Sequence, residues 1–216
     1  MEKLNDYVEH TLLKQDATTS DLLKIFEEAK EHNFLGVCVN PCCVKLAKEN
    51  LKESNVKVVT VIGFPLGANT TETKVFETQK AIADGADEID MVINVTKLKD
   101  QDYNYIINEI KSIKQACNGH NLKVIIETDL LTKDEIVKAC ECSIKGDADF
   151  VKTSTGFVKG GVGAKVEDVE LMFNTVKDSG LQVKASGGIR DKETAIAMIR
   201  AGAVRLGTSS GVKIVS

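Results

Sequence analysis

Apolar and polar positions follow two patterns that alternate along the chain. Short runs rich in valine and isoleucine are typical of strands buried on both faces, and longer segments with apolar residues three or four positions apart are typical of amphipathic helices. The expected strands cover residues 34–39, 56–62, 88–93, 122–127, 149–153, 181–185 and 203–206. A further strand at residues 7–10 would bring the number to eight.

Helical patterning fills the intervals between these strands. The expected helices cover about residues 19–31, 41–53, 71–83, 102–116, 132–143, 166–177 and 191–199. Thr132 and Glu135 have the spacing of a capping box, in which each side chain bonds the other residue's backbone N–H. Gly85, Gly146 and Gly202 each separate a helix from the next strand, and glycine there suits the left-handed backbone conformation just past a helix end.

Eight alternating strand–helix units predict an α/β fold, a (β/α)8 TIM barrel that residues 1–216 form as a single domain. The alternative is an open doubly wound sheet, whose dinucleotide-binding members carry Gly-x-Gly-x-x-Gly after the first strand. No such turn follows the first expected strand, and no Gly-x-x-x-x-Gly-Lys-Ser/Thr sequence occurs. No linker or low-complexity segment suggests a second domain.

Composition limits the partners of the protein. The chain has a formal net charge of -4, and its basic residues are spread along its length, which argues against nucleic acid or an anionic membrane as partner. No apolar run approaches the roughly 18 residues of a membrane span, and no signal peptide begins the chain. We therefore expect a cytoplasmic protein.

Its six cysteines and three histidines show no metal-ligand spacing, so we expect reduced thiols and no metal or other cofactor.

Two lysines lie inside apolar, strand-like runs, where a lysine is rarely buried unless it is paired. They are Lys152 in Phe-Val-Lys-Thr and Lys184 in Gln-Val-Lys-Ala. Because side chains alternate along a strand, both lysines should face the barrel interior together with Asp90 and Asn94 of an earlier strand. A desolvated amine beside a second cation can lose its proton and become a nucleophile. The alternative is a structural ion-pair network inside the barrel.

Electrostatic magnitudes favour the nucleophile. At its reference pKa near 10.4, a lysine is only about 0.04% neutral at pH 7. A second cation about 5 Å away costs on the order of 3 kcal/mol at an effective dielectric constant of roughly 20. That cost would lower the pKa by about two units, and desolvation can add to it. Lys152, which small residues follow directly, is the expected nucleophile, and Lys184 is the expected persistent cation.

Two turns rich in glycine and serine follow the last two expected strands. In TIM barrels the loops after the seventh and eighth strands commonly bind phosphate, because their backbone N–H groups point at the anion beside a short extra helix. Glycine lets the backbone approach the anion closely. The expected phosphate-binding residues are Gly187, Gly188, Gly207, Ser209 and Ser210. Ordinary turns are the alternative interpretation.

Eight segments, spread over nearly the whole chain, resemble the deoxyribose-phosphate aldolase (DeoC) family of class I aldolases. They lie at residues 9–13, 37–41, 60–67, 85–94, 123–128, 149–157, 183–190 and 205–210. The most distinctive are Asp-Phe-Val-Lys-Thr-Ser-Thr-Gly-Phe, which ends at Phe157, and Val-Lys-Ala-Ser-Gly-Gly-Ile-Arg, which ends at Arg190. Such a series of segments in the same order is highly specific.

The resemblance implies a carbon–carbon lyase that reversibly cleaves 2-deoxy-D-ribose 5-phosphate to D-glyceraldehyde 3-phosphate and acetaldehyde, in deoxyribose phosphate catabolism. It implies that Lys152 forms the Schiff base, that Asp90 relays protons and that Lys184 lowers the pKa of Lys152. No metal is implied, because the iminium serves as the electron sink. The implied partners are small sugar phosphates and aldehydes, and the expected assembly is a homo-oligomer, either a dimer or a tetramer.

Two features depart from the family pattern. Glu9 stands where the family usually has aspartate, and residues 157–165 form a stretch about two residues longer than in many relatives.

Two other functions remain as alternatives. One is a transaldolase-like enzyme with a different aldehyde donor, and the other is a non-catalytic barrel that binds sugar phosphates. The joint presence of Asp90, Lys152 and Lys184 argues against the second.

Overall fold

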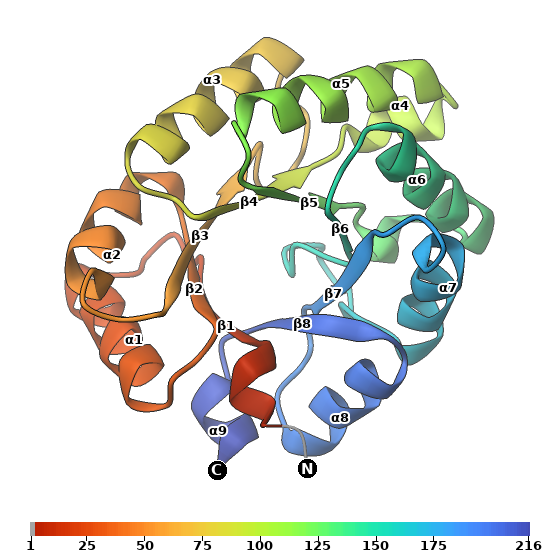
Figure 1. Cartoon of the computed structure of the whole chain (residues 1–216). Coiled ribbons are helices and arrows are strands. Elements are labelled where there is room, and N and C mark those ends of the chain that lie inside the picture. Colours follow the sequence, from red (N-terminus) through yellow and green to blue (C-terminus); the bar gives the residue numbers. More distant parts are fainter. Residues whose placement is uncertain (1–2) are drawn as a thin grey trace.

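The computed structural model describes residues 3–216, in which eight parallel strands close into a barrel (Figure 1). Each strand pairs with the next along the chain, and the eighth pairs with the first. The strands are β1 (Val8–Leu12), β2 (Gly36–Val39), β3 (Lys57–Ile62), β4 (Glu88–Val92), β5 (Asn121–Ile125), β6 (Phe150–Lys152), β7 (Gln182–Ser186) and β8 (Ala203–Thr208). This closed sheet confirms the predicted TIM barrel and excludes the open doubly wound alternative.

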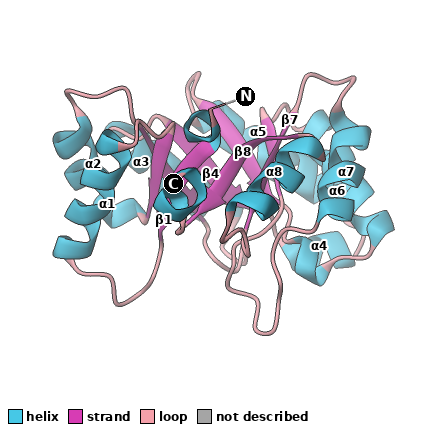
Figure 2. Ribbon diagram, turned by 90° about the horizontal axis from the view of Figure 1, so that it is seen from below, coloured by secondary structure: helices cyan, strands magenta, loops and turns pink. Residues whose placement is uncertain are grey.

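Helices surround the barrel. They are α1 (Thr19–Glu31), α2 (Val44–Leu51), α3 (Thr71–Ala83), α4 (Val95–Lys99), α5 (Tyr103–Ala116), α6 (Lys133–Lys145), α7 (Val166–Val176), α8 (Lys192–Arg200) and α9 (Gly211–Val215). Three short 3-10 helices, η1 (Leu4–Tyr7), η2 (Pro41–Cys43) and η3 (Thr128–Leu130), complete the described elements. Figure 2 shows α4 and long connecting loops on one side of the barrel and the N-terminal end on the other.

Helix ends follow the local chemistry of the sequence, with one correction. The capping box of Thr132 and Glu135 is present at the start of α6. Gly85 and Gly202 adopt positive φ angles of 106° and 111°, as expected. Gly146 ends α6 as expected, but its predicted left-handed conformation is wrong: its φ is -82°, and Asp147 is left-handed instead, at φ 62°. Glycine is required at 146 for another reason: a Cβ atom there would lie 2.5 Å from the Ile110 side chain of α5.

The main apolar core lies between the strands and the helices. On β4, Ile89 and Met91 point into this layer and are fully buried, whereas Asp90 between them points into the barrel. The same alternation places Val183 and Ala185 of β7 in the outer layer. The barrel interior therefore receives the polar residues of these strands, which is where a catalytic cluster can be built.

Some local predictions differ from the structure. Sequence periodicity did not predict α4, and Asn94 does not face the cavity, because its side chain caps α4 by accepting a hydrogen bond from the Lys97 N–H. The helix expected at residues 41–53 begins as the 3-10 helix η2, and α2 starts only at Val44. Burial raises the pKa of the Cys43 thiol to about 11. None of the six cysteines, all within residues 3–216, forms a disulfide in the structure.

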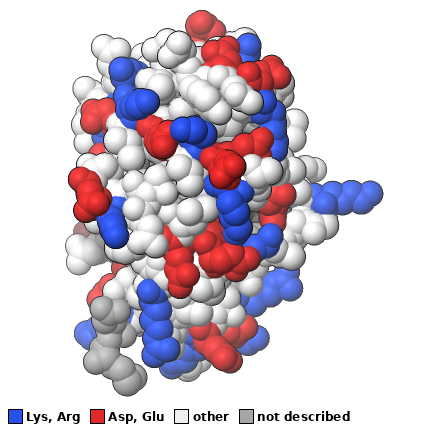
Figure 3. All heavy atoms as spheres, turned by 90° about the vertical axis from the view of Figure 1, so that its right-hand side faces the viewer, with Lys and Arg blue, Asp and Glu red and all other residues white. Residues whose placement is uncertain are grey.

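The outer surface carries both signs of charge. On the face that Figure 3 shows, acidic and basic side chains are interspersed, with no extensive area of one sign. Within residues 3–216, every helix is too short or too polar to cross a membrane.

Candidate active site

Asp90, Lys152 and Lys184 meet inside the barrel from three different strands. β4 carries Asp90, β6 carries Lys152 and β7 carries Lys184. The Nζ atoms of Lys152 and Lys184 donate hydrogen bonds of 2.8 Å and 2.7 Å to the same atom, Oδ2 of Asp90. One carboxylate oxygen therefore bridges the two amines, which makes the two lysines close electrostatic neighbours.

Further charged side chains complete a buried network around this group. Nζ of Lys123 lies 2.6 Å from Oε2 of Glu88 and 3.0 Å from Oδ1 of Asp90. It is also 3.5 Å from Oε1 of Glu9, and Lys184 donates a hydrogen bond to the other Glu9 oxygen. Each lysine is thus paired, which is the condition for burying a charge. The Glu9 carboxylate therefore contacts two of the lysines inside the barrel.

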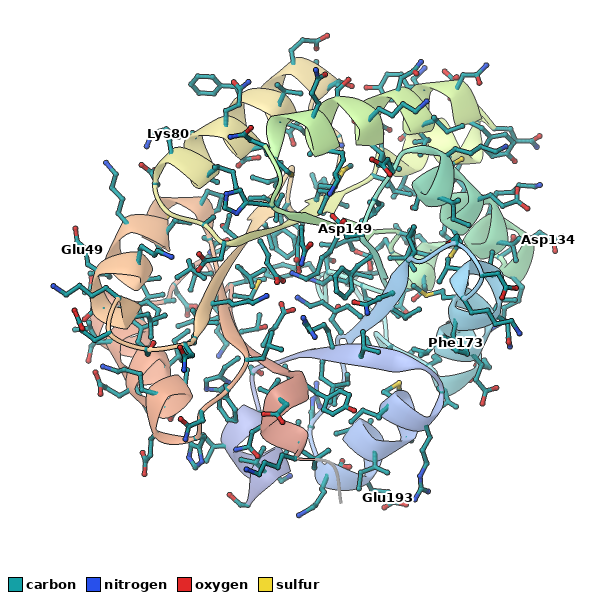
Figure 4. All side chains as sticks on the ribbon, viewed as in Figure 1. Glu49, Lys80, Asp134, Asp149, Phe173 and Glu193 are labelled. Carbon is teal, nitrogen blue, oxygen red and sulfur yellow. The ribbon has the colours of Figure 1, made fainter. Side chains whose placement is uncertain are left out.

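Figure 4 shows charged side chains in two places, inside the barrel and on the outer surface of the helices. Many nitrogen and oxygen ends of side chains gather inside the ring of strands. The labelled residues Glu49, Lys80, Asp134 and Glu193 lie instead at the outer edge, where the helices face solvent. Charge on the outer helices needs no special explanation, whereas charge inside the barrel does.

The network fixes the ionisation of its members. Burial raises the pKa of Asp90, but the three surrounding lysines outweigh burial and hold that pKa well below its usual value. Burial opposes the charged form of Lys184, yet the carboxylates of Asp90 and Glu9 raise its pKa above the ordinary value. The pKa of Lys123 is raised in the same way, with burial outweighed by Asp90, Glu9 and Glu88. At neutral pH, Asp90 is therefore a carboxylate, and Lys184 and Lys123 are cations.

Lys152 differs from the other two lysines in its contacts. It pairs with one carboxylate, that of Asp90, whereas Lys184 contacts two carboxylates and Lys123 contacts three. Lys152 also lines the cavity, while Lys123 and Lys184 are fully enclosed. The amine with the fewest anionic partners is thus the one that a small molecule can reach.

A cavity of about 230 Å³ opens at the carboxyl ends of β1, β6, β7 and β8, with Lys152 in its wall. Four of the five expected phosphate-binding residues also line this cavity: Gly187, Gly188, Gly207 and Ser209. The cavity lining does not include Ser210, whose backbone N–H donates a 2.9 Å hydrogen bond to Oγ1 of Thr208. Among residues 3–216, no group of three or more His, Cys, Asp or Glu side chains could hold a metal ion.

Comparison with known proteins identifies the family. The family model described as DeoC/LacD family aldolase matches residues 6–216. The chain belongs to this aldolase family. A deoxyribose-phosphate aldolase from Finegoldia magna is 58% identical over 213 residues, which are 99% of each chain. Another from Mycoplasma capricolum is 53% identical and covers 98% of this chain and 94% of the relative.

A solved structure agrees with these sequence relatives. The tetrameric deoxyribose phosphate aldolase from Aeropyrum pernix is 32% identical and superimposes with a TM-score of 0.91, over 98% of this chain and 89% of the other. The likeness thus extends over the whole barrel. The chain is therefore an aldolase, a carbon–carbon lyase, and the charged cluster at the end of its barrel is the candidate active site of a DeoC/LacD aldolase.

Sequence reasoning missed several charged residues of this aldolase site. Lys123 lies in an apolar strand run, which is the same signal that singled out Lys152. Arg190 and Lys14 are exposed and line the cavity. Arg190 directly follows the Gly-Gly-Ile turn after β7, so its position beside the expected phosphate-binding turn could have been inferred. Lys14 lies in a loop and carries no comparable signal.

Glu127 was also missed, and it secures the segment after Lys152. Its backbone is left-handed at φ 62°, an uncommon conformation for a residue other than glycine. Burial raises the pKa of Glu127, and its carboxyl group accepts hydrogen bonds from the backbone N–H and the hydroxyl of Thr155. Strained residues of this kind cluster at functional sites. Here the acidic side chain contacts the segment that directly follows β6.

Proposed function

We propose that the chain reversibly cleaves 2-deoxy-D-ribose 5-phosphate to D-glyceraldehyde 3-phosphate and acetaldehyde, with Lys152 as the Schiff-base lysine. The observation that carries the roles is the shared oxygen of Asp90, which binds an enclosed cation, Lys184, and an amine that lines the cavity, Lys152. A structural ion-pair network would have no reason to expose one amine to a cavity. The names of the relatives support the substrate.

The reaction begins when the neutral amine of Lys152 attacks the aldehyde carbon of the open-chain sugar. The carbinolamine loses water, and a protonated imine forms. The bond between C2 and C3 then breaks, its electron pair moves toward the iminium nitrogen to give an enamine, and the C3 hydroxyl releases its proton. Glyceraldehyde 3-phosphate leaves, C2 of the enamine takes up a proton, and water hydrolyses the imine to acetaldehyde and free Lys152. The iminium is the electron sink, so the proposal includes no metal.

Asp90 is the proposed proton carrier in these steps. Its carboxylate is ionised at neutral pH and touches Lys152, so it can accept a proton from a reacting group beside the imine and return it to C2. Lys184 is the proposed persistent cation, because its raised pKa keeps it charged while Lys152 cycles between amine and imine. A homo-oligomer, dimer or tetramer, belongs to the proposal, because the Aeropyrum pernix relative is tetrameric.

Borohydride trapping tests the function. Incubation with acetaldehyde and sodium borohydride should leave a reduced ethyl group on Lys152, detected by peptide mass mapping, because only a Schiff base is reduced to a stable amine. Dihydroxyacetone should give no adduct, which separates this enzyme from a transaldolase-like one. An adduct confined to Lys184 would reverse the two roles, and no adduct on any lysine would support a non-catalytic barrel.

The turns after β7 and β8 are the proposed phosphate site. Gly188 and Ser209 line the cavity there, with the exposed cations Lys14 and Arg190 beside them. Ser209→Glu places a negative charge at this position, so it should raise KM for deoxyribose 5-phosphate at least about tenfold by like-charge repulsion. KM for unphosphorylated deoxyribose should change little. Steady-state kinetics on both sugars decides the question, and equal effects on the two would argue against this location.

A further inference from the structure

The loop at residues 157–165, between β6 and α7, is seated against the proposed phosphate turn. In Figure 1 the cyan trace after β6 projects over the barrel opening. The Ala164 N–H donates a 3.1 Å hydrogen bond to the Gly187 carbonyl. A Cβ atom on Gly163 would lie 2.4 Å from the carbonyl carbon of Gly187, and one on Gly188 would lie 2.4 Å from the Val162 carbonyl oxygen. The two backbones therefore touch where any side chain would separate them.

Asp129 holds this loop in place from a third element. It lies in η3, directly after the β5 strand region, and its two carboxylate oxygens each accept a backbone hydrogen bond from the loop. Oδ1 is 3.2 Å from the Val162 nitrogen, and Oδ2 is 2.8 Å from the Gly163 nitrogen. Gly161 also passes so close that a Cβ atom there would lie 2.6 Å from Oδ2. Asp129 takes no part in the proposed reaction steps.

We propose that Asp129 is a positioning residue that sets the preference of this aldolase for a phosphorylated sugar. The inference rests on the proposed function, because it concerns the phosphate site of that reaction. Asp129 seats residues 162–164 against the turn, and this contact holds Gly187 and Gly188 in their left-handed conformations of φ 84° and 75°. A turn fixed before binding does not lose conformational freedom when the anion arrives, which strengthens binding.

The Schiff-base end of the cavity is secured by different contacts. The Thr153 hydroxyl donates a 2.9 Å hydrogen bond to the Ser186 carbonyl, and the Ser186 hydroxyl donates a 2.6 Å hydrogen bond to the Ser154 carbonyl. These bonds join β6 to β7 next to Lys152 and do not involve Asp129. Loss of Asp129 should therefore weaken phosphate binding and leave the chemistry at the aldehyde carbon intact.

The charge of Asp129 and its hydrogen bonds to the loop predict opposite changes in KM when Asp129 is replaced. The experiment therefore distinguishes the two effects. Removal of a negative charge near a phosphate would by itself improve phosphate binding and lower KM. Loss of the two hydrogen bonds to the loop should instead raise KM for deoxyribose 5-phosphate about tenfold in Asp129→Ala. We expect kcat, and kcat/KM for unphosphorylated deoxyribose, to change less than about threefold.

Two further variants sharpen the experiment. Gly163→Ala keeps the Asp129 carboxylate but forces the loop away from Gly187, so it should reproduce the rise in KM. The double variant Asp129→Ala/Gly163→Ala should be no worse than either single variant, because both remove one contact. Asp134→Ala, on the exposed first turn of α6, is the matched control and should leave both substrates unaffected.

The outcomes separate this inference from the function on which it rests. If acetaldehyde leaves no adduct on Lys152, or if the unaltered enzyme shows no preference for the phosphorylated sugar, the proposed function fails. If that preference is present and Ser209→Glu removes it, the function stands. A lower KM for deoxyribose 5-phosphate in Asp129→Ala, or an equal loss on both sugars, would then overturn the positioning role alone.

Discussion

Lys184→Leu should lower aldolase activity at neutral pH by roughly 10²-fold and move the pH–rate profile to the alkaline side. Lys152 and Lys184 share one oxygen of Asp90, so the charge of Lys184 disfavours a proton on Lys152. At about 5 Å and an effective dielectric constant of roughly 20, this repulsion is on the order of 3 kcal/mol. An energy of that size changes the fraction of neutral amine by about 10²-fold.

The sign of the pH effect follows from which charge is lost. The pKa of Lys184 is raised, so the unaltered enzyme keeps this cation throughout the neutral range. Without it, the Asp90 carboxylate still lies 2.8 Å from the Lys152 Nζ atom, and no neighbouring cation opposes this contact from β7. Part of the lost rate should return as the pH rises, because a higher pH increases the fraction of neutral amine available for attack on the aldehyde.

Two variants control this experiment. Lys152→Leu should show no recovery at any pH, because the nucleophile itself is absent. Lys138→Leu removes an exposed lysine whose partner is Glu141 on the same helix, and it should leave the profile unchanged. Initial rates between neutral and alkaline pH give the comparison. A Lys184→Leu profile that loses height without shifting would show that Lys184 positions Asp90 and does not act through its charge on Lys152.

The barrel could be predicted because its strands are buried on both faces. Such strands are continuous apolar runs, and the helices between them have a strong three-to-four-residue period, so the predicted bounds of α1 and α3 match the structure. Element ends were less predictable. β6 ends at Lys152, where Thr153 turns its hydroxyl to the Ser186 carbonyl. The helix α4 has only five residues, too few for a periodic pattern to be recognised.

The same reasoning explains which site residues were found. A charged residue in an apolar strand is conspicuous, so the sequence singled out Asp90, Lys152 and Lys184. Asp129 lies in the short 3-10 helix η3 and Lys74 in α3, and charged residues are common in such elements. Their roles depend on contacts with segments far along the chain, which local sequence patterns do not record.

Lys74 is a residue whose role depends on contacts with distant segments of the chain. It is a fully buried lysine outside the barrel interior. Its Nζ atom reaches out from α3 and donates a 2.8 Å hydrogen bond to the Val92 carbonyl and a 2.9 Å hydrogen bond to Oε1 of Glu109 on α5. The other oxygen of Glu109 accepts a 3.2 Å hydrogen bond from the Asn94 N–H. The pair therefore ties two helices to the end of β4, two residues beyond Asp90.

Neither charge of this pair is favoured by its surroundings. Burial lowers the pKa of Lys74 and raises the pKa of Glu109, and in each case the partner only partly offsets burial. A buried ion pair of this kind contributes little net stability compared with apolar residues, yet loss of one partner leaves an uncompensated charge. This asymmetry gives the pair a measurable signature that a surface ion pair lacks.

Lys74→Met and Glu109→Leu should each lower the free energy of unfolding by about 3–5 kcal/mol. The double variant should cost about as much as either single one, because no charge is left unpaired and only the Val92 carbonyl and the Asn94 N–H lose partners. Urea unfolding at neutral pH and one protein concentration measures all three. Lys80→Met, which breaks the exposed Lys80–Asp84 pair of α3, should change stability by less than about 1 kcal/mol. Additive losses in the double variant would mean that Lys74 and Glu109 stabilise the fold through separate contacts and not as a pair.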